Sequence, residues 1–170
     1  MLWRLGQGAW AADLLHGSGE MSARLMIIAM MLTPLRMLFP NVRWLLWLRR
    51  HRRELGVAAF AYAALHTVFY LIDMETLRNV LAEVTALGIW TGWVAFFLFV
   101  PLAITSNNFF VDKLGAGWFN LHRLVYLAAV LTLVHWIFVH NNAVPAWVHF
   151  APLIALEVYR LIKSQRIVAS

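Results

Sequence analysis

The sequence contains no cysteine among its 170 residues. This absence excludes disulfide bonds, iron–sulfur clusters held by cysteine, covalent haem attachment through a CxxCH motif, and a thiol nucleophile. Any metal ion must therefore be bound by histidine, carboxylate or methionine side chains. The chain also lacks a glycine-rich phosphate-binding loop. The connections between its apolar stretches are too short to form a flavin or nucleotide domain.

Charged residues are scarce as well. They make up 13% of the chain, whereas hydrophobic residues make up 62%. Because soluble domains average about 25% charged residues, we predict an integral membrane protein. The net charge of +6 is then interpreted as a signal of membrane topology, and no nucleic-acid partner is expected.

Five stretches are long and apolar enough to cross a bilayer, which takes about 20 residues. They predict an all-α fold: a polytopic bundle of about five transmembrane helices in contact with lipid. The five stretches are residues 21–39, 55–72, 84–106, 118–140 and 144–162. Residues 1–20 are interrupted by charges and glycines, so we expect an interfacial segment or a remnant helix there. Residues 21–170 form the predicted transmembrane domain.

The basic residues are unevenly distributed between the two predicted sides of the membrane. Eleven of the 14 fall on one side when the connections are assigned alternately: Arg36, Arg43, Arg49, Arg50, Arg52, Arg53, Lys113, Arg123, Arg160, Lys163 and Arg166. By the positive-inside rule this side is cytoplasmic. We therefore expect the N-terminus outside and the C-terminus in the cytoplasm.

Three histidines, His66, His122 and His135, lie well inside predicted spans, where an ionisable side chain indicates function. His140 and His149 fall near the outer boundary. With a helical rise of about 1.5 Å per residue, His66 lies roughly 20 Å and His135 roughly 25 Å from the cytoplasmic boundary. The two therefore share a depth, and as neutral imidazoles they could bind one metal centre from neighbouring helices. The alternative for each is a core histidine bonded to a backbone carbonyl.

His122 lies thirteen residues before His135, roughly 20 Å nearer the cytoplasm, so a second centre would lie beneath the first. On an ideal helix the two side chains point about 140° apart. They face one cleft only if the helix is locally unwound, as in a π-bulge, or if the centres are offset sideways. His51, in the basic connection, is a candidate partner for His122; otherwise it belongs to a solvated loop.

The residues around these histidines are typical of a b-type haem site. Alanines in AAFAYAALH and LAAVLTLVH would let a flat macrocycle lie between helices. Arg52, Arg53 and Arg123 could neutralise haem propionates on the inner side. The predicted cofactor-binding residues are thus His66, His122, His135, Arg52, Arg123 and His51, with the first three as metal ligands.

An ordered set of motifs resembles the ferric reductase-like transmembrane superfamily. The set comprises TPLR, then RRxLG with LH ten residues on, then PLAxTS, LG, W, LHRLVYL and LxH. Within that superfamily, the chain is most similar to the haem-binding membrane subunits of bacterial periplasmic methionine-sulfoxide reductase systems. Members usually have an additional N-terminal helix, where this chain has only residues 1–20.

The resemblance implies a b-haem subunit of the bacterial inner membrane with one or two haems. It would carry electrons from a cytoplasmic flavin reductase or quinol to a periplasmic molybdopterin methionine-sulfoxide reductase. Such a chain is an electron-transfer subunit of an oxidoreductase system, and FMN or quinone is a further candidate cofactor. The family's intramembrane histidines fall on His66, His122 and His135.

Two other functions remain open from the sequence. One is a ferric or other metal reductase, or another transmembrane b-haem electron carrier. The other is a haem-free membrane scaffold or small transporter in which the histidines only pack.

Overall fold

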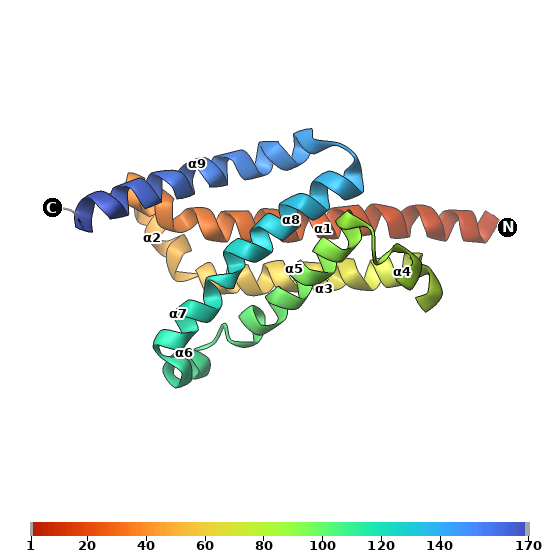
Figure 1. The fold of residues 1–170 in the computed structure, drawn as a ribbon, viewed down its shortest axis with the longest axis horizontal. Helices are drawn as coiled ribbons and strands as arrows, with labels where there is room; N and C mark the ends of the chain where they lie inside the picture. Colours follow the sequence, from red (N-terminus) through yellow and green to blue (C-terminus); the bar gives the residue numbers. More distant parts are fainter. Residues whose placement is uncertain (1, 169–170) are drawn as a thin grey trace.

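Long helices form over all five apolar stretches (Figure 1). The computed structural model describes residues 2–168, and the side chains of residues 14–165 within them. The long helices are α1 (Leu2–Leu38), α3 (Arg52–Asp73), α5 (Leu87–Ile104), α8 (Leu124–His140) and α9 (Ala143–Val168). The described residues contain no strand, which confirms the predicted all-α fold.

Four segments have the length and hydropathy needed to cross a membrane: Leu14–Leu38, Arg52–Asp73, Leu87–Ile104 and Ala116–His140. The molecule is therefore a helical membrane bundle, and the predicted count of five spans is approximate. The fifth long helix, α9, has the length of a span but does not meet the same hydropathy criterion.

Short helices occupy the polar connections. They are α2 (Arg43–Arg50), α4 (Leu77–Glu83), α6 (Asn108–Leu114) and α7 (Ala116–His122). Two of them begin at residues whose side chains cap the helix. Thr76 accepts a hydrogen bond from the backbone N–H of Asn79, and Asn107 accepts one from that of Phe110. Residues 2–20 form helical backbone continuous with the rest of α1; their role stays a prediction.

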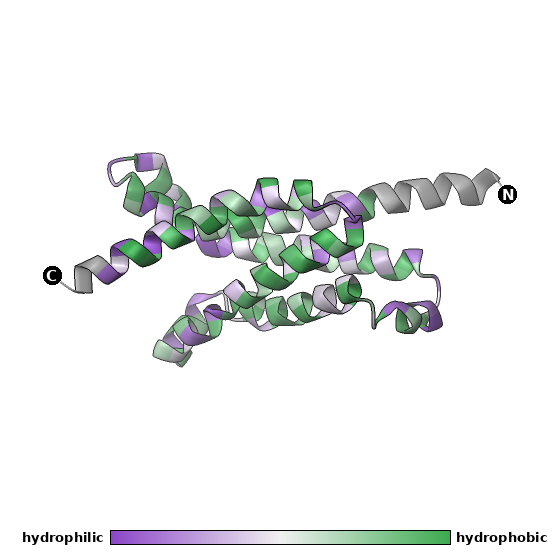
Figure 2. Cartoon of the chain, turned by 45° about the horizontal axis from the view of Figure 1, so that its top comes forward, coloured by the Kyte–Doolittle hydropathy of each residue, from purple (hydrophilic) through white to green (hydrophobic). Residues whose placement is uncertain are grey.

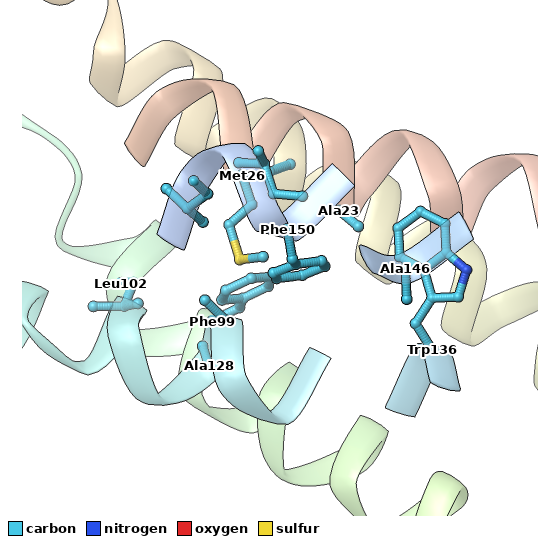
Figure 3. Packing of buried hydrophobic residues seen from close by; sticks show 12 residues of the cluster. Ala23, Met26, Phe99, Leu102, Ala128, Trp136, Ala146 and Phe150 are labelled. Atoms are coloured by element: carbon cyan, nitrogen blue, oxygen red, sulfur yellow. The ribbon is translucent and has the colours of Figure 1, made fainter. Parts of the chain in front are cut away.

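Small residues bring the long helices close together. Helix α1 packs against α3 on one side and α9 on the other, and α5 packs against α8. At the α5–α8 contact, a Cβ added to Gly88 would lie 3.0 Å from a methyl of Val139. Figure 3 shows the shared core, in which the completely buried Ala128 lies beside Phe99 and the completely buried Ala146 lies beside Trp136.

The two ends of the bundle differ in charge. Hydrophobic residues dominate the middle of the long helices, and hydrophilic residues gather at the ends and connections (Figure 2). Helices α2, α6 and α7 and the end of α9 lie at one end, which we call the arginine-rich end. Helix α4 and the α8–α9 connection lie at the opposite end, called here the α4 end. The fold thus places the predicted basic side of the sequence at one end of the bundle.

Candidate functional site

The imidazole rings of His66 and His135 face each other between α3 and α8. Their centroids lie 6.1 Å apart, and the ring planes are inclined at 85°. Counting residues from the cytoplasmic boundary predicted that the two histidines lie at a similar depth on neighbouring helices. The structure brings their rings together. That they bind a metal ion stays a prediction.

Each of these rings is oriented by a backbone carbonyl on a different helix. Nδ1 of His66 lies 2.8 Å from the Leu15 oxygen of α1, and Nδ1 of His135 lies 2.6 Å from the Gly88 oxygen of α5. A carbonyl oxygen only accepts, so in both rings Nδ1 carries the proton and donates. The lone pair of a neutral imidazole is then on Nε2, as a metal ligand requires.

Two glycines make room for these rings. A Cβ on Gly19 of α1 would lie 2.8 Å from His66 Nδ1, and a Cβ on Gly92 of α5 would lie 2.5 Å from His135 Nδ1. Any larger residue at either position would push the imidazole away from its carbonyl partner. The rings therefore have backbone behind them on one side and a cavity on the other.

The cavity beside the two rings, which we call the His66–His135 cavity, has a volume of about 290 Å³. Helices α1, α3, α5 and α8 all contribute to it, with Ala63, Ala95, Phe96 and Phe99 forming part of an apolar wall. Polar side chains gather toward its α4 end, where His16, Tyr70 and His140 line it.

The His66–His135 cavity fits a haem better than a bare metal ion. Within the described residues, no three His, Cys, Asp or Glu side chains are grouped so that they could hold an ion. A haem iron needs only two protein ligands, because the porphyrin supplies the equatorial nitrogens. Two imidazoles that shared one metal through Nε2 would have centroids about 6 Å apart, since a metal–nitrogen bond is about 2 Å. The observed separation matches that value.

His122 does not join this pair. Its Nε2 lies 3.0 Å from the Thr105 hydroxyl, and its ring stacks on Trp118 with centroids 3.8 Å apart. The Trp118 indole N–H in turn donates to the Thr105 carbonyl at 2.8 Å. His122 is therefore held by Thr105, which directly follows α5, and by Trp118 of α7, instead of by the helix that carries His66.

An interruption of the helix at Arg123 separates the two histidines of the fourth span. Helix α7 ends at His122 and α8 begins at Leu124, and the N–H of Tyr126 donates to the Arg123 carbonyl at 3.1 Å. A bond between residues three apart tightens the turn. The sequence left open a π-bulge or laterally offset centres; the structure has a tightened turn, and each histidine lines its own cavity.

The second cavity lies toward the arginine-rich end and is called here the arginine-lined cavity. Its volume is about 390 Å³, and Phe99 lines both cavities and so lies between them. Four arginine residues line it together with His122: Arg52, Arg53, Arg123 and Arg160, of which Arg160 is paired with Glu157 at 2.8 Å. Aromatic residues Phe60, Trp118, Phe119 and Tyr126 complete much of its wall. The arrangement suits a planar ligand with anionic substituents.

His51 lies outside both cavities, at the junction of α2 and α3. Its ring packs on Trp47 with centroids 4.3 Å apart, and its Nδ1 lies 2.9 Å from the Trp47 carbonyl. The side chain thus closes the last turn of α2. Of the six predicted cofactor-binding residues, His51 is the one that the structure separates from a cavity.

Several residues that shape the site were missed from the sequence. Gly19 and Gly92 carried a signal, because glycine within an apolar helix marks close approach of another group. Thr105 and Trp118, which hold His122, gave no comparable signal. The carbonyl groups of Leu15 and Gly88 gave no signal either, because every residue has a backbone carbonyl.

Comparison with known proteins gives one family match and several similar chains. The chain matches the family described as "Ferric reductase like transmembrane component" over residues 18–133. It is 36% identical to the "protein-methionine-sulfoxide reductase heme-binding subunit MsrQ" of Brucella anthropi, with 87% of this chain and 67% of that protein covered. It is 35% identical to the subunit of the same name from Brucella ovis, with 86% and 66% covered. The chain therefore spans about two thirds of the length of these relatives. No solved structure matches it.

Proposed function

Because this chain belongs to the ferric reductase-like transmembrane family, we propose that it holds a b-type haem between His66 and His135 and carries electrons across the membrane. The observation that carries the proposal is the geometry of the histidine pair. Two imidazoles from different helices, each with Nδ1 bonded to a carbonyl, have centroids 6.1 Å apart. A bound haem supplies one-electron redox chemistry; the protein supplies the ligands, their orientation and an apolar wall.

The arginine-lined cavity is the proposed entry point for electrons. Its guanidinium groups would pair with the propionates of a second haem or with the phosphate of FMN, while its aromatic walls would cover the planar ring. Quinone is a further candidate occupant. Arg52 is held toward α1 by a 3.1 Å bond to the Thr33 hydroxyl. His122 would contact the occupant from the Trp118 side, and His51 is proposed only as a more distant contributor.

The relatives named as heme-binding subunits of methionine-sulfoxide reductase supply the proposed partners. Electrons would come from a cytoplasmic flavin reductase or from quinol at the arginine-rich end. They would leave at the α4 end to a periplasmic molybdopterin enzyme that reduces methionine sulfoxide. Electron transfer in this direction requires that the chain lie in the bacterial inner membrane, with the N-terminus in the periplasm and the C-terminus in the cytoplasm.

Ligand replacement tests the haem site. We expect the purified protein to show the reduced b-type spectrum, and His66→Ala and His135→Ala each to abolish the haem bound between the two rings. The matched control is His149→Ala, because His149 stacks on Trp136 and is hydrogen-bonded to Arg24 instead of lining either cavity. Haem per polypeptide is measured as the pyridine haemochrome. Equal haem in all three variants would refute the pairing.

A further inference from the structure

Helix α2 has a face that the bundle leaves uncovered and that the proposed haem site does not use. Leu45 is the buried residue of this helix, with 2% of its surface exposed. Arg43, Trp47 and Arg50 stand roughly 140–160° away from Leu45 at 3.6 residues per turn, and all three are exposed. The face opposite the core therefore carries two guanidinium groups and an indole ring.

Large apolar side chains lie beside these arginines. Trp44 and Trp47 have 62% and 59% of their surfaces exposed, and Leu46 is exposed as well. Exposed aromatic surface of this size on a short helix indicates contact with another molecule. We call Arg43, Trp44, Trp47 and Arg50 the α2 patch.

The arginines of the α2 patch have no carboxylate partner in the part of the chain that the structure describes. The salt bridges there lie within α1 and within α9. Helix α2 itself contains no acidic residue, and the nearest ones along the chain are Glu20 and Glu54. A guanidinium group pairs well with phosphate, because its N–H donors match two phosphate oxygens. The patch is therefore suited to a phosphate-bearing anion from outside the chain.

The connectivity of the chain places α2 at the surface of the membrane. The span before it ends at Leu38, and the span after it begins at Arg52. Only residues 39–42 precede α2 and only His51 separates it from α3, so the helix cannot extend far from the bilayer. At this depth tryptophan side chains contact the lipid headgroup region, and basic side chains attract anionic lipids.

We propose that the α2 patch binds the headgroup of an anionic phospholipid. Arg43 and Arg50 pair with its phosphate, and Trp44 and Trp47 contact its glycerol and the upper part of its acyl chains. A free phosphate ion would pair with the arginines but leave both indole rings uncovered, whereas a phospholipid covers both. The cationic headgroup of a zwitterionic lipid is repelled by the two arginines, so the patch selects a lipid with net negative charge.

Native mass spectrometry of the purified full chain in detergent tests the proposal. With equimolar phosphatidylglycerol and phosphatidylcholine, we expect the wild-type protein to retain phosphatidylglycerol preferentially. One basic residue near an anionic lipid contributes about fivefold in affinity. Arg43→Gln and Arg50→Gln should therefore each lower the preference about fivefold, while Arg43→Lys, which keeps the charge, should retain most of it. Unchanged elution in gel filtration shows that the variants fold.

Two further variants separate the roles of charge and apolar contact. Lys113→Gln is the matched control, because Lys113 is exposed at the same end of the bundle but lies on α6 next to Asp112. It should leave the lipid preference unchanged. Trp44→Ala should weaken the binding of both lipids alike, since the indole contacts the part that they share, and should leave their ratio as in wild type.

Three results would overturn the proposal. Equal retention of the two lipids by the wild-type protein would leave the patch to an acidic protein surface. An equal loss of preference in Lys113→Gln and Arg43→Gln would show that only the overall charge matters. Displacement of the lipid by excess inorganic phosphate would assign the arginines to a free anion. The measurement does not depend on haem, so each of these results would leave the proposed function standing.

Discussion

At the scale of single residues, the candidate site depends on what lies behind each histidine. His66 and His135 are both fixed through Nδ1 by a carbonyl oxygen, and each ring lies against a glycine. His122 is engaged through Nε2 by Thr105 and covered by Trp118. His66 and His135 therefore have the tautomer and the space that a metal ligand needs. In His122 the Nε2 atom is already hydrogen-bonded to a protein side chain.

The glycine behind His66 gives a test with a control on the same helix. Gly19→Ala places a methyl group 2.8 Å from His66 Nδ1, whereas Gly17→Ala meets nothing within 4 Å. We expect Gly19→Ala to retain haem roughly tenfold less tightly, as for other changes that displace a metal-binding histidine. Gly17→Ala should behave as wild type. Equal haem retention in the two variants would contradict the role assigned to Gly19.

At the scale of helices, the contact between α5 and α8 both builds the core and orients a ligand. Gly88 lets the two helices approach, because an added Cβ would meet Val139 at 3.0 Å and Phe138 at 3.2 Å. The carbonyl of the same residue accepts the bond from His135. Separation of these helices would therefore move His135 as well as loosen the core.

Gly88→Ala tests this coupling. Overpacking costs about 1–3 kcal/mol, while replacing glycine by alanine within a helix returns about 0.5–1 kcal/mol. We expect a net decrease in thermal stability, measured by tryptophan fluorescence in detergent, together with weaker haem binding. Gly117→Ala in α7 is the control, because its added methyl meets nothing within 4 Å and should be neutral or stabilising. Equal melting temperatures would show that α5 and α8 tolerate the added methyl.

At the scale of the whole molecule, the proposed direction of electron flow requires a fixed orientation in the membrane. The arginine-rich end and the α4 end are distinguished by charge and by the cavities nearest them. The arginine-lined cavity should face the cytoplasm, since the positive-inside rule places the basic connections there.

The absence of native cysteine makes the orientation directly measurable. A cysteine replacing Asn142, in the α8–α9 connection, should react with a membrane-impermeant maleimide in intact cells. One replacing Ser164, near the arginine-rich end of α9, should react only after the membrane is permeabilised. Both residues are exposed, so access depends on the side of the membrane. The reverse labelling pattern would contradict the proposed topology.

Much of the fold could be predicted from the sequence because hydrophobic length and helical rise are local properties. They located the apolar helices and placed His66 beside His135 before any packing was known. The turn at Arg123 could not be predicted in this way, since LHRLVYL has no proline or glycine to mark it. The Thr105–His122 contact and the positions of Gly19 and Gly92 against the other two rings depend on which helices pack together. A single sequence does not show which helices are neighbours.

The central claim is that His66 and His135 bind one haem iron from opposite sides. Electron paramagnetic resonance of the ferric protein tests it most directly, because the signal reports the spin state and the relative orientation of the axial ligands. With ring planes inclined at 85°, we predict a strongly anisotropic low-spin signal that disappears in both His66→Ala and His135→Ala. A wild-type protein without this strongly anisotropic signal, or one in which the same signal survives either replacement, would contradict the claim.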